Sequence, residues 1–337
     1  MAKKTITYEQ ILSDLKQKQY APVYLLTGEE AYYIDLISDF IQNNVLDEME
    51  REFNLTVLYG KDTDISSVIN AAKRYPMMSN YQVVIVKEAQ HIKAWDNLAY
   101  YLQKPLNSTI LVLCYKYGVP DKRKKWVLDI DKAGVVFESQ KLRDYETAGW
   151  IAQYAKSKNI QLDEKATALL AEFLGSDLSK IANELNKLAL TIAAGTRITP
   201  DIIEKNIGIS KDYNVFELQA ALINRDVLKA NRIIRYFADN KKNNPLVLVL
   251  GQLFNFFSNL MLYHYLNDKS QMTVASELKI NPYFVKDYAK AARIFGAWKT
   301  MNIISHIRET DARSKGVENS GADDGDLMKE LIYRILH

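Results

Sequence analysis

The turn at Gly28, in the sequence Y-L-L-T-G-E-E, follows an apolar stretch and precedes an amphipathic one, as in a phosphate-binding loop. Such a loop has the pattern G-x-x-x-x-G-K-[ST], in which backbone amides and lysine bind phosphate and the hydroxyl binds magnesium. Here the second glycine and the lysine are absent, and Glu29 and Glu30 place negative charge where phosphate would bind. We therefore expect a degenerate loop that does not bind ATP, with both carboxylates in the first turn of the helix.

A basic run, D-K-R-K-K-W, is the second feature that could bind a charged partner. Lys122, Arg123, Lys124 and Lys125 precede Trp126 in this run. Clustered cations can follow a nucleic-acid backbone and make binding strongly salt-dependent. A solvated helix start explains the same run, and the net charge of +3 does not decide between the two interpretations.

Residues for metal or nucleophilic chemistry are sparse. Four histidines, at 91, 264, 306 and 337, are scattered without metal-ligand spacing, and no G-x-S-x-G motif occurs. Cys114 is the only cysteine, and its setting in T-I-L-V-L-C-Y indicates a buried strand thiol. Glu88 follows an apolar strand but stands alone, which favours a solvated strand end over a catalytic acid. We expect no catalytic site, metal or cofactor.

An apolar pair, Met77 and Met78, lies in the turn that contains Tyr75 and Pro76. Turns normally contain polar residues, so two thioethers here are either tucked under a sheet or offered to a partner. The local pattern favours burial, because most apolar pairs next to a strand belong to a core. Methionine also suits a surface that must repack around another protein, which keeps the second interpretation open.

Short apolar runs alternate with helical stretches through the first 142 residues and must position these features. The pattern predicts strands at 23–27, 54–58, 82–87, 109–114 and 134–137. Helices are predicted between them, including 65–75, which we expect to stop before Pro76. This alternation predicts a parallel five-stranded sheet covered by helices on both faces.

After residue 142 the pattern predicts helices and no further strand of this kind. We expect an α/β domain at 1–142, a small helical domain at 143–210 and a second helical domain at 211–337. Asp163 and Asp326 are expected helix N-caps. The helix at 245–262 is apolar nearly all round, which predicts burial on several sides.

We expect no targeting segment in this chain. Its N-terminus lacks the apolar stretch of a signal peptide, and we expect no apolar run approaching the roughly 20 residues that span a bilayer. A cytoplasmic protein without membrane contact is the expectation.

Taken together, these pieces make the chain resemble the delta-subunit family of bacterial DNA polymerase III clamp loaders. The resemblance covers nearly the whole length. It is carried by Y-L-L-T-G-E-E, the apolar loop before Y-Q-V-V-I-V-K-E-A, the D-K-R-K-K-W segment and G-S-D-L-S-K-I-A-N-E-L-N-K-L. Each motif is weak alone, but their order and spacing are fairly specific.

The resemblance implies a AAA+-like first domain, a helical lid and a helical collar. It also implies an accessory subunit of a DNA-directed DNA polymerase holoenzyme, and this holoenzyme is a nucleotidyltransferase. The subunit itself opens the sliding clamp for DNA replication without hydrolysing ATP. Its implied partners are the beta sliding clamp, the gamma/tau and delta-prime subunits through the collar, and primed DNA in the assembled complex. An obligate homo-oligomer is not implied.

Members of the family insert an apolar pair, commonly Leu-Phe, into a pocket on the clamp. The pair lies in the loop before the third predicted strand. By similarity that pair falls on Met77 and Met78, with Tyr75 and Pro76 beside them. This sequence departs from Leu-Phe. Two other functions stay open from the residues: an active P-loop ATPase using Gly28, and a free-standing DNA-binding protein using Lys122 to Lys125.

Overall fold

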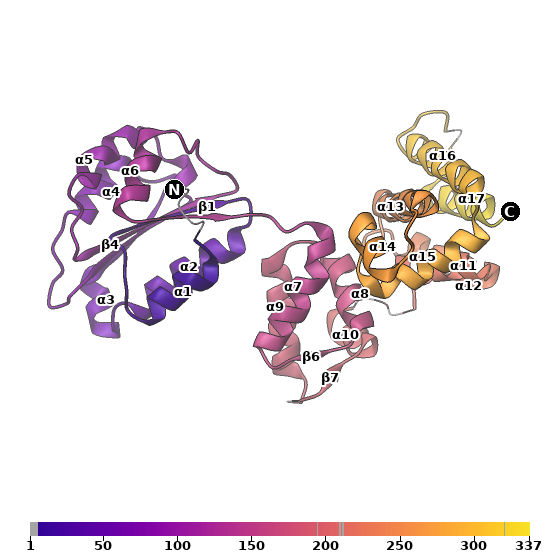
Figure 1. Ribbon diagram of the computed structural model, residues 1–337, viewed down its shortest axis with the longest axis horizontal. Coiled ribbons are helices and arrows are strands. Elements are labelled where there is room, and N and C mark those ends of the chain that lie inside the picture. Colours follow the sequence, from indigo (N-terminus) through magenta and orange to yellow (C-terminus); the bar gives the residue numbers. More distant parts are fainter. Residues whose placement is uncertain (1–5, 194, 209, 211, 320) are drawn as a thin grey trace. The chain divides into compact units, whose positions relative to one another are not determined.

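The computed structural model describes residues 6–193, 195–208, 210, 212–319 and 321–337. The chain forms two compact units (Figure 1). The first runs to Arg143 and includes Ser176–Lys180, and the second comprises Asp144–Gly175 and Ile181–His337. The division into three domains at 142 and 210 stays a prediction.

A five-stranded sheet forms the centre of the first unit. Its strands pair in the order β2-β3-β4-β1-β5, and every pairing is parallel, as predicted. The predicted positions of all five strands are confirmed to within two residues at each end, and those of β3 agree fully. The strands are β1 (Val23–Gly28), β2 (Leu55–Tyr59), β3 (Gln82–Lys87), β4 (Thr109–Lys116) and β5 (Val135–Ser139).

Helices cover both faces of this sheet (Figure 1). Leu25 and Leu113 pack into the core on one face, and the neighbouring Leu26 and Val112 pack into the core on the other. The alternation follows from the two-residue period of a strand, and it explains why the strands are apolar throughout. One face carries α1 (Tyr8–Lys16) and α2 (Ala31–Asn44); the other carries α4 (Ile65–Ala72), α5 (Ala99–Leu102) and α6 (Lys125–Ala133).

Helix ends in the first unit differ from the predictions because side chains cap them. Helix α4 ends at Ala72, not at Tyr75, since buried Gln82 and Thr109 donate hydrogen bonds to the carbonyls of its last two residues. The remaining elements are α3 (Glu48–Asn54) and the short 3₁₀ helices η1 (Ala89–His91) and η2 (Trp95–Leu98).

The next segment is helical but also contains two short strands, which correct the expectation of helices alone. Gln161 and Leu162 pair in parallel with Arg197 and Ile198. Asp163 follows the first strand and is the N-cap of α8, as predicted. The elements are α7 (Asp144–Ser157), β6 (Gln161–Leu162), α8 (Glu164–Leu174), α9 (Leu178–Thr191), β7 (Arg197–Ile198) and α10 (Pro200–Ile207).

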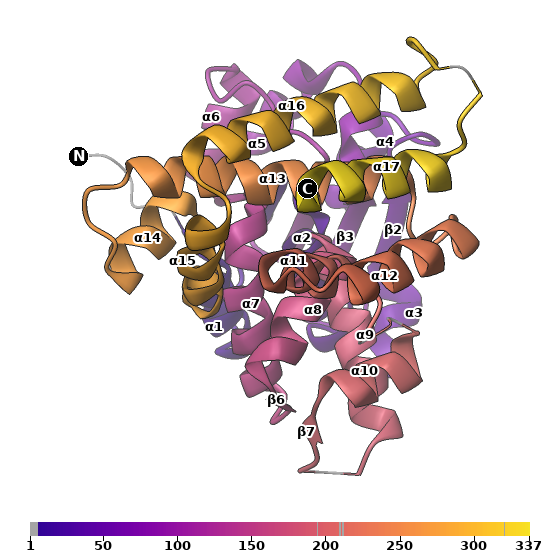
Figure 2. The same cartoon turned by 90° about the vertical axis from the view of Figure 1, so that its right-hand side faces the viewer.

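The C-terminal helices share one apolar core. Helices α16 and α17 lie side by side in both views, and Arg313 and Glu330 join them with an ion pair of 2.7 Å (Figures 1 and 2). The N-cap of α17 is Asp323 rather than the predicted Asp326, because Asp323 accepts the backbone N–H of Asp326. The helices are α11 (Val215–Asn224), α12 (Val227–Asp239), α13 (Leu246–Tyr265), α14 (Gln271–Leu278), η3 (Pro282–Phe284), α15 (Val285–Ile294), α16 (Ala297–Ser314) and α17 (Asp324–Leu336).

Helix α13 corrects two expectations. Its 20 residues are long and apolar enough to cross a membrane by length and composition, although no such run was expected. One such helix is weak grounds for a membrane span, because core helices of soluble proteins pass the same test. Leu253, Phe257 and Leu260 are buried in the C-terminal core, whereas Leu248 and Leu262 are exposed. The helix is therefore buried on one face, not on several.

Candidate functional site

The turn after β1 is closed by backbone hydrogen bonds. The Gly28 N–H donates to the Gly118 carbonyl at 2.9 Å, and the Gly118 N–H donates to the Gly28 carbonyl at 3.2 Å. Gly28 has φ +134°, and a Cβ placed there would lie 1.9 Å from the Ser139 carbonyl oxygen. Only glycine fits this turn. The Gly28 amide is thus already bonded within the protein.

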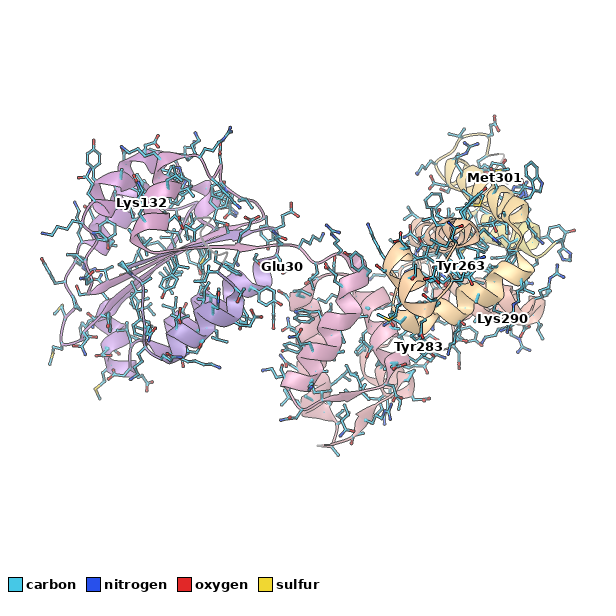
Figure 3. All side chains as sticks on the ribbon, in the orientation of Figure 1. Glu30, Lys132, Tyr263, Tyr283, Lys290 and Met301 are labelled. Atoms are coloured by element: carbon cyan, nitrogen blue, oxygen red, sulfur yellow. The ribbon has the colours of Figure 1, made fainter. Side chains whose placement is uncertain are left out.

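Glu30 occupies the start of α2 (Figure 3). Its carboxylate accepts the Tyr32 N–H at 2.9 Å, and it is the N-cap of the helix, not a residue of its first turn as predicted. Only 8% of Glu30 is exposed, whereas Glu29 is exposed. Burial raises the pKa of Glu30. A carboxylate of the chain therefore lies at the helix N-terminus, where a phosphate would bind in a working loop.

Charges beside this turn are the reverse of those in a nucleotide site. Lys116, at the end of β4, pairs with Asp35 on α2 at 2.5 Å, and Lys87, at the end of β3, lies 3.7 Å from Asp39. A working site has its lysine on the helix and its acids at the strand ends. Burial is the largest single effect and would lower the pKa of Lys116, but the hydrogen bond with Asp35 and the nearby negative charges together outweigh it, so the pKa is raised. Ion pairs of the chain fill this edge of the sheet.

Two of the four basic run residues have acidic partners. Lys122 pairs with Glu138 at 2.5 Å, and the Arg123 guanidinium donates two hydrogen bonds to Asp121. In the described part of the chain, Lys124 and Lys125 form no ion pair. They are the N-cap and first residue of α6, where positive charge opposes the helix dipole. An anionic partner would relieve that repulsion.

Trp126, the aromatic residue of the run, is not available for stacking on a base. It is 5% exposed and stacks on Trp95 with ring centroids 4.5 Å apart. The basic run therefore offers charge alone.

The loop between α4 and β3, residues 73–81, is called the methionine loop below. It exposes its apolar residues. Met78 is fully exposed, Met77 is 56% exposed, and Tyr75 is 76% exposed, whereas Pro76 is partly buried. The local expectation that the methionine pair is buried is wrong. The backbone of Met77 joins the loop to the domain through hydrogen bonds, whereas the side chains of Met77 and Met78 do not pack into the core.

A hydrogen-bonded contact with α3 provides that attachment. The buried Asn54 side chain binds both the N–H and the carbonyl of Met77, at 2.7 and 2.9 Å. Asn54 was not among the residues predicted from the sequence, because no local signal marks a contact across 23 positions.

The structure does not bring the predicted residues together at one point. The Gly28 turn follows a strand of the parallel sheet and the methionine loop precedes one, so they lie at opposite edges. A cavity of about 400 Å³ in the second unit, lined partly by Phe216, Phe256 and Tyr288, includes none of them. The candidate interaction site is therefore the methionine loop, and the Gly28 turn is a separate, self-filled region.

The sheet order and the helical segments that follow define a AAA+-like protein. A family model described as "DNA polymerase III, delta subunit" matches residues 24–140, and one described as the C-terminal domain of that subunit matches 212–332. A third, described as a middle domain, matches 143–205. The chain belongs to the delta-subunit family of DNA polymerase III, which confirms the resemblance seen in the sequence.

Two relatives from Bacillus subtilis agree with this assignment. The chain is 28% identical to "DNA polymerase III subunit delta" of strain 168, over 96% of this chain and 94% of the relative. A solved DNA clamp loader delta protein is 25% identical, with a TM-score of 0.55, over 98% of this chain and 99% of that one. The similarity therefore extends through both units.

The raised pKa of Glu30 generates a test of the filled turn. A carboxyl that binds its proton more tightly when folded contributes stability below its ordinary pKa of 4.5, and this contribution is lost as pH rises through the folded-state pKa. Glu30→Gln keeps an acceptor for the Tyr32 N–H but does not ionise. We expect the stability of the variant relative to wild type to rise as the pH increases above the ordinary pKa of 4.5, measured by urea unfolding.

Glu29→Gln is the control, because Glu29 is exposed. A Glu30→Gln difference that stays constant with pH would contradict the burial of a charged cap.

Proposed function

We propose that this chain binds the beta sliding clamp and opens it for loading onto primed DNA, as the delta subunit of a clamp loader. Membership in the delta-subunit family supports the assignment. The observation that carries it is the exposure of two adjacent apolar side chains, Met77 and Met78, on a loop whose backbone is hydrogen-bonded to the domain. Exposed apolar side chains on an ordered loop are typical of a protein contact.

Opening follows from differential affinity. Met77 and Met78 enter a pocket of the clamp, flanked by Tyr75 and Pro76, and bind the open state more tightly than the closed one. The clamp equilibrium then shifts toward the open state by the difference between the two binding free energies. Two flexible thioethers can adapt to a pocket as it changes shape.

ATP hydrolysis has no part in the action of this chain. The bonded Gly28 amide, the Glu30 cap and the Lys116–Asp35 pair support this, because each occupies a position that a working nucleotide site needs. Hydrolysis belongs to the gamma/tau subunits of the assembly, which join this chain and delta-prime through the C-terminal helices. Exposed Leu248, Leu262 and Trp298 on α13 and α16 support such a contact.

Direct DNA contact by this chain is secondary. Lys124 and Lys125 are the cations best placed for it, since Lys122 and Arg123 already have acidic partners. The role does not require a membrane, and the subunit acts in the cytoplasm as one member of a hetero-oligomer.

The first prediction from this proposed function concerns the methionine pair. Replacing both residues, Met77→Ala with Met78→Ala, removes two apolar anchors that each contribute about 1 to 4 kcal/mol when buried in a partner pocket. We expect clamp affinity to fall at least about tenfold, because about 1.4 kcal/mol corresponds to a factor of ten. Surface plasmon resonance with immobilised clamp would measure the decrease.

Met272→Ala is the matched control, because Met272 is 85% exposed but lies on α14. Unchanged clamp affinity of the double variant with an intact fold would remove these residues from the proposed interface.

The second prediction concerns nucleotide. Calorimetric titration of the wild-type chain with magnesium-ATP should give no saturable binding at millimolar nucleotide, since the turn is occupied by groups of the chain itself. Saturable binding of magnesium-ATP at the Gly28 turn would instead support an active P-loop ATPase.

The third prediction concerns the basic run. In the assembled loader on primed DNA, replacing Lys124 and Lys125 with alanine should weaken binding and reduce the slope of log K against log salt. The slope should change by up to about 0.9 for each duplex phosphate that the variant no longer neutralises. Lys122→Ala is the control, because Glu138 already neutralises that lysine. An unchanged slope would exclude direct DNA contact by Lys124 and Lys125.

A further inference from the structure

The methionine loop is fastened at its tip by a single buried side chain. Asn54 is 1% exposed, and its amide contacts the backbone of Met77, 23 residues later in the chain. The Met77 N–H donates to Oδ1 at 2.7 Å, and Nδ2 donates to the Met77 carbonyl at 2.9 Å. These are the two hydrogen bonds that a neighbouring strand would make with one residue.

The amide of Asn54 is fully used. Besides Met77, Nδ2 donates to the carbonyl of Glu50, four residues earlier in α3, at 3.0 Å. Both amide hydrogens and the carbonyl oxygen therefore have partners, so burial of this polar group carries no unsatisfied hydrogen bond. The Asn54 side chain therefore joins the loop tip to α3, and its bond to the Glu50 carbonyl fixes the orientation of its amide.

The base of the loop is fastened by the next two strands. Gln82 starts β3 and donates to the Ala71 carbonyl at 3.0 Å; Thr109 starts β4 and donates to the Ala72 carbonyl at 3.0 Å. Both are buried. Asn54 immediately precedes β2, so three polar residues lie at the starts of three adjacent strands. Two hold the end of α4, and Asn54 holds the tip.

Met78 has a backbone conformation that its own side chain does not stabilise. Its φ is +52°, in the left-handed region, which is unfavourable for a residue other than glycine. The side chain is fully exposed and gains nothing by packing. The conformation therefore depends on the fixed backbone before it, and Asn54 fixes that backbone at Met77.

We infer that Asn54 is a positioning residue, which holds Met77 and Met78 in the geometry that the clamp pocket receives. The inference rests on the proposed function. Ordering a loop on binding costs conformational entropy for each backbone residue that becomes fixed. A loop ordered beforehand avoids this cost, so its anchors bind more tightly. Asn54 contributes to affinity without touching the clamp.

Asn54→Asp tests the inference directly. Aspartate keeps Oδ1 for the Met77 N–H but replaces the donor that faces the carbonyls of Met77 and Glu50 with an acceptor. We expect clamp affinity to fall about tenfold or more although both methionines remain. Asn44→Asp is the control, because Asn44 makes a similar bond to the Phe40 carbonyl at 2.9 Å in the same unit but does not contact the loop.

A double-mutant cycle separates positioning from general destabilisation. Asn54→Asp should lose most of its effect when Met77 and Met78 are already alanine, since it acts through them. An equal loss of affinity in both backgrounds, or no loss in wild type, would overturn the inference. Circular dichroism confirms that each variant is folded at the binding temperature.

Spin labelling provides a second measurement that does not use the clamp. Cys114 is buried with its pKa raised to about 12, so a nitroxide would react with a cysteine introduced as Asn80→Cys and not with the native thiol. Asn54→Asp should increase nitroxide mobility, and unchanged mobility would overturn the inference.

Failure of the positioning role of Asn54 can be distinguished from failure of the proposed clamp binding. If wild type binds the clamp and the methionine variant does not, but Asn54→Asp binds normally, the positioning role alone fails. If wild type does not bind the clamp, the proposed function fails and the inference fails with it.

Discussion

Parallel pairing in the five-stranded sheet is the constraint on which the first unit depends. Each connection must return the chain across a face of the sheet, so all strands start at one edge and end at the other. The Gly28 turn follows a strand and the loop at 73–81 precedes one. A six-residue strand such as β3 spans about 20 Å. The region that resembles a nucleotide site and the exposed methionines are therefore separated by the sheet itself.

At the edge where strands start, buried polar side chains replace the missing backbone partners of the loop. Asn54, Gln82 and Thr109 each bond a carbonyl near the loop, and their burial makes these bonds specific. The second polar atom of the Gln82 amide, Oε1, has no partner among the described residues. The loop is thus joined to the domain by hydrogen bonds from three buried polar side chains.

At the opposite edge the same topology is retained with its charges reversed. Glu30 caps the helix that would receive phosphate, and Asp35 and Asp39 on that helix pair with lysines at the strand ends. These interactions stabilise the sheet and helix packing without any ligand. The edge at which the strands end is therefore filled by interactions within the chain, and the exposed apolar loop lies at the other edge.

The sequence by itself determined the positions of the five strands, their parallel pairing and the family. Apolar periodicity and motif order are local properties of the chain, so both can be recognised without the tertiary structure. It also located the methionine loop, but its local pattern favoured burial. Only the tertiary structure decided that Met77 and Met78 are exposed, that Glu30 caps α2 and that α13 is buried on one face. These outcomes depend on contacts such as Asn54 with Met77, whose partners are distant in sequence and whose geometry exists only after the strands pair.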